Sequence, residues 1–360
     1  MNMPSLEVLV AGAVLVSLTF YALMGGADYG GGVWNLLASG PRSWAQRELI
    51  AKAIGPIWEA NHVWLILVIV VLFTCFPVAF STIATALHIP LTLMLIGIVC
   101  RGSAFAFRNH EHREGDLKRR WERVFALASL LTPILLGVVV GAIASGKIQT
   151  HGSNFTAVFI EPWLAPFPFA VGLFALALFA YLAAVYLTLE TDDPELREDF
   201  RKRALGAAAA VGLMALVVYL LSGTGAPSVK RDLSSSWWTW PLQLATGVMA
   251  LGAVFSLWTN RFHLARLFAA GQVGLIVWGW ALAQFPYLVE PNITIYNAAA
   301  PVTTLRVVLI ALRWWPAHFC SCRHSTICCE FSKVVQLSEQ RRKSLIDPFQ
   351  REASVTSEKG

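Results

Sequence analysis

Charge is scarce in this sequence. Only 14% of its 360 residues are Asp, Glu, Lys or Arg, whereas 56% are hydrophobic. A soluble domain carries about 25% charged residues, so the composition excludes an ordinary soluble protein and predicts a polytopic membrane protein. A net charge of +6 raises the alternative of nucleic-acid binding. The charges are spread over loops between apolar runs, however, as is typical of membrane topology signals, and we expect no nucleic-acid partner.

Several functional signatures are also absent. No Lys or Arg precedes the first apolar run, since the first is Arg42. A cleavable signal would have a basic region there, so this run is predicted to be an uncleaved first helix. The apolar part contains no Gly-rich phosphate loop, nucleophile triad or zinc signature, which predicts no catalytic residue and no metal site. Cys75 and Cys100 lie in apolar runs, where cysteine is most simply a small buried hydrophobe.

Eight apolar runs are long enough to cross a bilayer, which takes about 20 mostly apolar residues. The predicted spans are 6–24, 57–76, 83–104, 124–145, 168–189, 204–222, 242–259 and 267–287. A ninth run begins at Thr304 and stops at "RWWP" after about nine residues, roughly half of the required length. We therefore predict an all-α, polytopic transmembrane helix bundle with eight spans and a truncated ninth, over residues 1–312.

The loops give the orientation. Those after the first, third, fifth and seventh spans are rich in Arg and Lys, whereas the alternate loops have only Lys147, Lys230 and Arg231. Cytoplasmic loops carry the excess of basic residues. The odd-numbered loops are therefore predicted to be cytoplasmic and the N-terminus to lie on the outer face.

Polar groups gather at the predicted cytoplasmic ends of the first three spans. "GGADYGGG" follows the first span and contains Asp28, while Glu59, Asn61 and His62 open the second and Arg101 closes the third. The topology places these residues at a similar depth. Ionisable groups inside a membrane are costly and usually face a cavity or a partner, so the cluster is a candidate functional site.

These residues also have structural interpretations. Pro56 suits the first turn of a helix, where Glu59 would interact favourably with the helix dipole. Asp28, in a Gly-rich break, could cap its own backbone. Glu59 and His62 are three residues apart and share a helix face, where a carboxylate beside an imidazole could relay protons. From these residues alone, both the structural role and the proton role stay open.

Two histidines raise the question of haem. A bis-imidazole site needs two ligands at similar depth, but His62 is predicted near the cytoplasmic edge and His88 near the outer edge. We therefore expect no haem on this chain and predict a packed or hydrogen-bonded His88.

Residues 313–360 form an atypical tail that begins "RWWPAHFCSCRHSTICCEFSKVV". Its four cysteines match no zinc spacing, so no metal site is predicted. The abrupt change from an apolar helix start suggests the hypothesis that the natural C-terminus has been replaced, for example by a change of reading frame. Sequencing the locus would test it. The last stretch, 338–360, is predicted to be disordered.

Three motifs carry a resemblance to a known family. They are "GGADYGGGVWNLL" (25–37), "IGPIWEANHVWL" (54–65) and "RGSAFAFR" (101–108), with the span layout through about residue 312. With these the chain resembles subunit II of cytochrome bd-type quinol oxidases, including the cyanide-insensitive branch. The resemblance implies a non-haem subunit of a terminal oxidase in the bacterial cytoplasmic membrane.

The same resemblance implies the partners. Subunit I would form a heterodimer with the first helices of this chain, carry haems b and d, and hold the quinol site. The complex would oxidise quinol and reduce dioxygen to water with protons from the cytoplasm. Membrane lipid and quinone are the other expected partners.

The resemblance also implies roles for individual residues that match the family's motifs. Glu59 matches the acidic position of the family's W-[DE]-x-N motif, which is associated with a cytoplasmic proton path, and Asp28 and His62 are candidates for the same path. Arg101 matches a position of structural or proton-path importance.

The remaining matches concern aromatic and amide residues. Trp64 matches a tryptophan linked to the hydrophobic oxygen route, while Trp58 and Asn61 complete the motif as packing and hydrogen-bonding residues.

One alternative function is that of a secondary transporter, because polar breaks in apolar helices also mark ion sites. A transporter would have such breaks near mid-membrane in both halves, whereas here they lie at one edge of the first half. Another alternative, a purely structural scaffold, differs only in whether Glu59 conducts protons.

Overall fold

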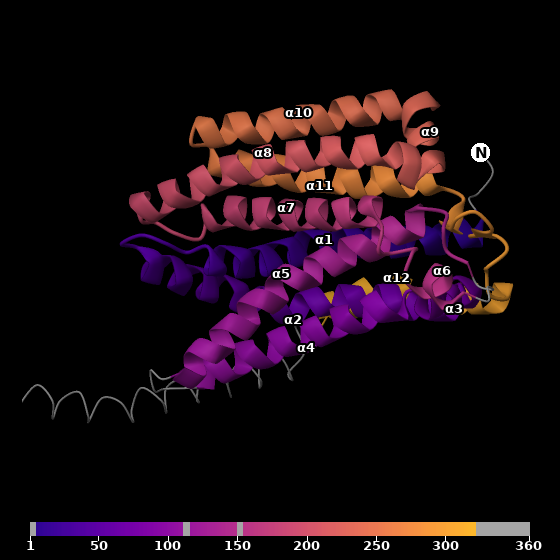
Figure 1. Cartoon of the computed structure of the whole chain (residues 1–360), viewed down its shortest axis with the longest axis horizontal. Coiled ribbons are helices and arrows are strands. Elements are labelled where there is room, and N and C mark those ends of the chain that lie inside the picture. The colour runs from indigo at the N-terminus through magenta and orange to yellow at the C-terminus, as the bar shows by residue number, and fades with distance from the viewer. Residues whose placement is uncertain (1–4, 111–115, 150–153, 322–360) are drawn as a thin grey trace, which may run out of the picture. The chain divides into compact units, whose positions relative to one another are not determined.

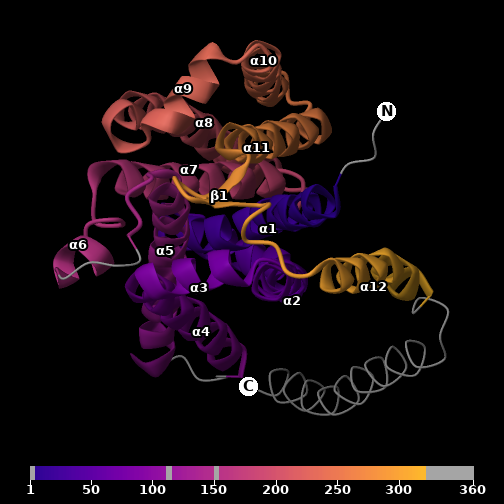
Figure 2. The same ribbon diagram turned by 90° about the vertical axis from the view of Figure 1, so that its right-hand side faces the viewer.

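The computed structural model describes residues 5–110, 116–149 and 154–321. The chain divides into two compact units, Met1–Pro301 and Val302–Gly360. Long helices make up the first unit (Figures 1 and 2). They are α1 (Leu6–Leu36), α2 (Ser43–Cys75), α3 (Pro77–Ala86), α4 (His88–His110), α5 (Asp116–Ala144), α6 (Phe155–Phe159), α7 (Pro166–Leu187), α8 (Pro194–Gly225), α9 (Pro227–Ser235), α10 (Thr239–Trp258) and α11 (Phe262–Gln284). An antiparallel hairpin, β1 (Tyr287–Val289) and β2 (Ile293–Thr294), follows.

The all-α membrane class is confirmed. Seven of the eight predicted spans each fall on one long helix. Six described helices are long and apolar enough to cross a membrane: α1, the 123–144 part of α5, α7, α8, α10 and α11. Residues 61–75 of α2 and the bent helix α3 make a seventh when taken together. Within α4, the apolar stretch whose side chains the structure describes is His88–Ala104. The predicted number of eight spans is therefore not established.

The Gly-rich motif does not break the first helix, so that prediction is wrong. α1 continues through "GGADYGGG" to Leu36. A Cβ atom at Gly30 would overlap the backbone carbonyl of Phe179, and one at Gly26 would lie 2.6 Å from Cδ1 of Leu182. These glycines therefore let α1 approach α7 closely, which is the use that small residues have between membrane helices.

The interpretation of Pro56 as a first-turn residue is also wrong. α2 begins at Ser43, so Pro56 and Glu59 lie well inside the helix. At the other end, α2 stops at Cys75 and α3 starts at Pro77 with a bend of 117°. A proline at the start of a helix loses no intrahelical hydrogen bond. The predicted third span, from 83, is consequently divided between α3 and α4.

The second unit contains α12 (Val302–Ser321). This helix runs past "RWWP" and is longer than predicted. The predictions for the rest of the tail, a disordered end and no metal site, concern residues outside the described ranges.

Helix α7 forms the centre of the first unit. It packs against α1, α5 and α8 (Figure 2), and every residue from 178 to 185 is buried. The outward side of the bundle is apolar instead, as at Leu251 and Trp258 of α10, which are 72% and 74% exposed. An apolar exterior of this kind fits a hydrocarbon surrounding.

Candidate functional site

A buried ion pair joins α1 to α4. The Asp28 and Arg101 side chains are 0% and 1% exposed. Arg101 donates from Nη1 to Oδ2 of Asp28 at 2.6 Å and from Nη2 to Oδ1 at 2.5 Å. Nη2 also donates to the Asp28 carbonyl oxygen at 2.9 Å. The guanidinium and carboxylate groups thus make the paired contact that gives Arg its geometric specificity, and each charge offsets the burial of the other.

Neighbouring side chains complete the surroundings of Arg101. Its Nε atom donates to Oγ of Ser129 on α5 at 2.9 Å. The guanidinium carbon lies 4.7 Å from the centroid of the Tyr29 ring and 5.0 Å from that of Phe125. Such cation–π contacts strengthen where water is excluded. Arg101 therefore holds α1, α4 and α5 together at one point.

Asn61 approaches the same region from α2. Its side chain is fully buried, and a Cβ atom at Gly25 would lie 3.1 Å from its Oδ1 atom. Gly25 precedes Asp28 by three residues, so both belong to one face of α1. The structure therefore gathers Asp28, Arg101 and Asn61, as the predicted topology required.

The remaining candidate residues on α2 lie apart from that cluster or outside the described side chains. Trp64 stacks on the exposed Phe20 of α1, with ring centroids 4.6 Å apart and an angle of 18° between the rings. His62 is half-buried. Trp58 and Glu59 belong to α2, but their side chains are outside the described part of the structure.

His62 and His88 do not fit a bis-imidazole haem site. Nδ1 of His88 lies 2.9 Å from the Thr85 carbonyl oxygen, and its ring packs edge-on against Phe159, which confirms the packed, hydrogen-bonded prediction. His62 precedes the end of α2 at Cys75 by thirteen residues, or about 20 Å at 1.5 Å per residue. His88 follows the bend after Cys75, so the two imidazoles lie at different depths.

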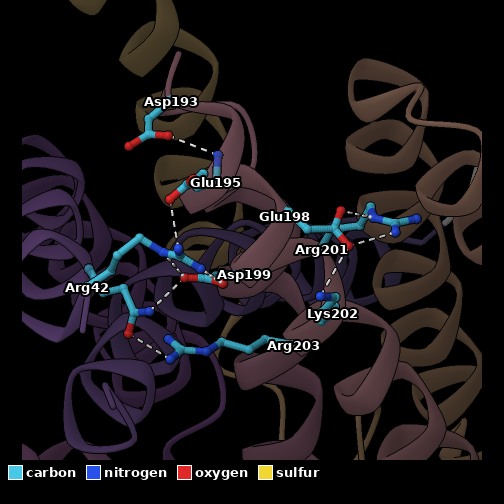
Figure 3. Close-up of polar contacts among 9 residues, drawn as sticks. Arg42, Asp193, Glu195, Glu198, Asp199, Arg201, Lys202 and Arg203 are labelled. Atoms are coloured by element: carbon cyan, nitrogen blue, oxygen red, sulfur yellow. Dashed lines mark hydrogen bonds and ion pairs between the residues drawn. The ribbon is translucent and has the colours of Figure 1, made fainter. Parts of the chain in front are cut away.

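A second polar network occupies the end of the bundle where α2 and α8 begin (Figure 3). We call this the basic end, because the Arg-rich loops lie there. Arg42 binds Asp199 at 2.7 Å and Glu195 at 2.7 Å. Gln46 donates to Asp199 at 2.9 Å and accepts from Arg203 at 2.7 Å. Hydrogen bonding to Asp199 raises the pKa of Arg42 above its usual value.

This second network could not be predicted from the sequence, because its partners are about 150 residues apart. Ser129 and Tyr29 were missed for a different reason: single hydroxyl groups in apolar helices are ordinary. A stripe of polar and glycine positions at helical spacing, Tyr21, Gly25, Asp28 and Tyr29, is the signal that would have marked the inner face of α1.

Comparison with known proteins gives a consistent result. The family model for cytochrome bd terminal oxidase subunit II matches residues 6–315. The putative cytochrome bd menaquinol oxidase subunit II of Bacillus subtilis is 21% identical over 316 residues, covering 84% of this chain and 90% of that protein. The cytochrome bd-I ubiquinol oxidase subunit 2 of Escherichia coli is 22% identical over 343 residues, covering 85% and 87%. The bd oxidase structure from Geobacillus thermodenitrificans has the same fold, with a TM-score of 0.72 at 22% identity over 88% of this chain and 98% of that chain.

Proposed function

Since this chain belongs to the cytochrome bd terminal oxidase subunit II family and is therefore one subunit of a membrane quinol oxidase complex, we propose that it supplies the complex with a proton entry at Glu59. The family membership places it in a haem-containing complex with subunit I, in the bacterial inner membrane, and does not favour the transporter. We further propose a heterodimer in which subunit I holds haems b and d and oxidises quinol. The positions of His62 and His88 support this assignment, because they do not suit a shared haem.

The orientation is part of the proposal. The basic end faces the cytoplasm and the N-terminus faces outward, because basic loops stay on the cytoplasmic side. The uninterrupted apolar run of α2 begins at Val63 in the sequence. Glu59 therefore lies where the helix passes from a polar to an apolar stretch, within reach of cytoplasmic protons. This position of Glu59 is the observation that carries the proposal.

The outward face of α2 suggests where those protons go. Four exposed apolar residues of α2 recur at intervals of three or four, which defines one helix face. They are Val63, Ile66, Val70 and Phe73. In the sequence, Glu59 precedes Val63 by four residues, which is the same spacing. An ionisable group is costly against lipid, so we assign the face to contact with subunit I and the exposed faces of α8 and α10 to lipid.

The other site residues take supporting roles in the proposal. His62, one turn after Glu59, is a second proton carrier. Both carboxylate oxygens of Asp28 are bound by Arg101, so we assign this pair to holding the helices in place. Trp64, stacked on exposed Phe20 between α1 and α2, marks an apolar route for dioxygen, and Trp58 is a packing residue.

Replacing Glu59 with Gln tests the proton entry. The purified complex should keep its reduced-minus-oxidised haem spectrum. Loss of a proton-transfer group slows a reaction about 100-fold or more where that transfer limits the rate. We therefore expect quinol-dependent oxygen uptake to fall by at least about tenfold. The matched control is Glu48→Gln, an exposed glutamate of the same helix, which should leave uptake unchanged. Normal turnover of the Glu59→Gln complex would leave a purely structural role for this subunit.

A further inference from the structure

Four helices place a second polar layer next to the ion pair. The first layer consists of Asp28 on α1, Arg101 on α4 and Ser129 on α5. One turn further from the basic end, the same helices present Gly25, Gly97 and Thr132. One turn corresponds to about 5 Å along each helix. Asn61 reaches this second layer from α2, because it lies against Gly25.

The second layer is closed. Asn61 is 0% exposed, and Thr132, Tyr21 and Tyr29 are each 1% exposed. The Thr132 hydroxyl lies directly against Gly97, where a Cβ atom would overlap it. Tyr21 and Tyr29 also belong to the apolar cluster around Leu182 and Val185. No bulk solvent therefore reaches these side chains from within this subunit.

Five buried polar atoms in this layer, or within about one helical turn of it, lack a hydrogen-bond partner among the described residues. They are Oδ1 and Nδ2 of Asn61, Oγ1 of Thr132 and the hydroxyl oxygens of Tyr21 and Tyr29. The Tyr21 and Tyr29 hydroxyls interact with each other as a side-chain hydrogen-bonding pair, but at a geometry outside the usual limits of a hydrogen bond. Each hydroxyl can both donate and accept, so the pair keeps capacity for a further partner. Buried polar atoms in proteins are nearly always paired, with protein or with ordered water, and an unpaired one is costly. Such atoms gathered in a single layer point to a bound ligand.

The hydrogen-bond donors and acceptors of the layer indicate which kind of ligand fits. Nδ2 of Asn61 can only donate and Oδ1 can only accept, while the three hydroxyls can do both. An ion of one sign could not satisfy both atoms of the amide. The adjacent ion pair carries no net charge, so it favours neither sign. Water both donates and accepts, and buried water typically makes about three hydrogen bonds to groups of this kind.

We infer that this layer is an internal water site, in which ordered water bridges Asn61, Thr132 and the hydroxyls of Tyr21 and Tyr29. The water fixes the Asn61 side chain and therefore the register of α2 against α1 beside Glu59 and His62. This inference goes beyond the proton entry, since the site exists whether or not Glu59 carries protons. Asn61 and Thr132 are thus positioning residues.

Thermal stability tests the site through the sign of the change. Thr132→Val keeps the shape of the side chain and removes one hydroxyl. If water pairs with that hydroxyl, its loss lowers the thermal midpoint of the purified two-subunit complex. If the layer is dry, the substitution removes an unpaired buried hydroxyl, and the midpoint stays or rises. Thr188→Val is the matched control, because its buried hydroxyl donates to the Val185 carbonyl oxygen at 2.7 Å and its loss should lower the midpoint.

A midpoint for Thr132→Val that falls as it does for Thr188→Val supports the water site, and an unchanged or higher midpoint overturns it. Should the Thr132→Val complex not assemble, a density map of the unsubstituted complex at a resolution that shows water decides instead. A peak within hydrogen-bond distance of Asn61 and of Thr132 or a tyrosine hydroxyl supports the site. A map without such a peak overturns it.

Discussion

Replacing Arg101 with Met leaves a buried carboxylate without its partner. The substitution removes three hydrogen bonds to Asp28 and one to Ser129. Asp28 is 0% exposed, so water cannot replace them. Removing one member of a buried ion pair costs about 3–5 kcal/mol, which is a factor of roughly 100 to 5,000 in an equilibrium constant. We expect a similar loss for Asp28→Leu, which leaves the guanidinium unpaired.

The double variant Asp28→Leu/Arg101→Met behaves differently. Replacing both members of a buried pair by apolar residues of similar size is often neutral, or stabilising by about 1–4 kcal/mol. Ser129 can then bond a carbonyl oxygen of its own helix. The double variant should therefore be far more stable than either single variant, with the strong coupling that residues in contact show.

The assay is heating of the detergent-solubilised complex, followed by measurement of the fraction that keeps its haem spectrum and its two subunits. Single substitutions that each cost less than about 1 kcal/mol, the range for exposed pairs, would refute the assignment of a stabilising buried pair. So would a double variant whose loss equals the sum of the two single losses. Oxygen uptake of the double variant adds a second test: lost turnover with an intact spectrum would place Asp28 on the proton path instead.

Two further predictions concern packing and pH. Gly30→Ala should reduce the yield of assembled complex, because its Cβ would overlap the Phe179 carbonyl group, whereas Gly12→Ala, with no atom within 4 Å, should not; equal yields would contradict the close contact of α1 with α7. Burial, with a smaller contribution from Asp232, raises the pKa of Glu290 in the β1–β2 hairpin above its ordinary value. The folded state therefore binds the Glu290 proton more tightly than the unfolded state does. The contribution of this bound proton to the free energy of unfolding is complete below the ordinary glutamate pKa and is lost as pH rises through the raised pKa. Thermal midpoints measured across that range should fall less for Glu290→Gln than for the unsubstituted chain, and parallel profiles would contradict this.

The sequence predicted the helices better than it predicted their ends and contacts. Apolar length depends only on local residues, and seven of the eight predicted spans each fall on one helix. The extra length of α2, from Ser43, was missed because residues 43–53 mix charged and apolar side chains. Apolar length does not reveal a helix that continues beyond an apolar run. Whether glycines break a helix or allow close packing depends on a neighbour, here Phe179 of α7, which no local pattern of residues identifies.

The site shows the same limit. Topology gave Asp28 and Arg101 a common depth, but their pairing depends on how α1 and α4 meet, which is a property of the packed bundle. Thr132 carries no signal on its own, since a hydroxyl in an apolar helix usually bonds a carbonyl oxygen of that helix, as Thr19 does with Leu15. It becomes notable only when its hydroxyl is buried without a partner.

The contacts of Asp28 suit a carboxylate that stays ionised, whereas a proton carrier must gain and lose its charge. A carboxylate that binds Arg through both oxygens gains from staying ionised, so protonating it would forfeit those charge-assisted bonds. Asp28 is bound in this way, and a group that must take up and release a proton in each turnover is poorly served by such a partner. A proton carrier works best with its pKa near the operating pH, in a place that protons can reach. In the proposed orientation position 59 is such a place, because it precedes the uninterrupted apolar run of α2 that begins at Val63. We therefore expect the two carboxylates to fail differently when replaced: Asp28 through loss of the assembled complex, and Glu59 through loss of turnover in a complex that still assembles.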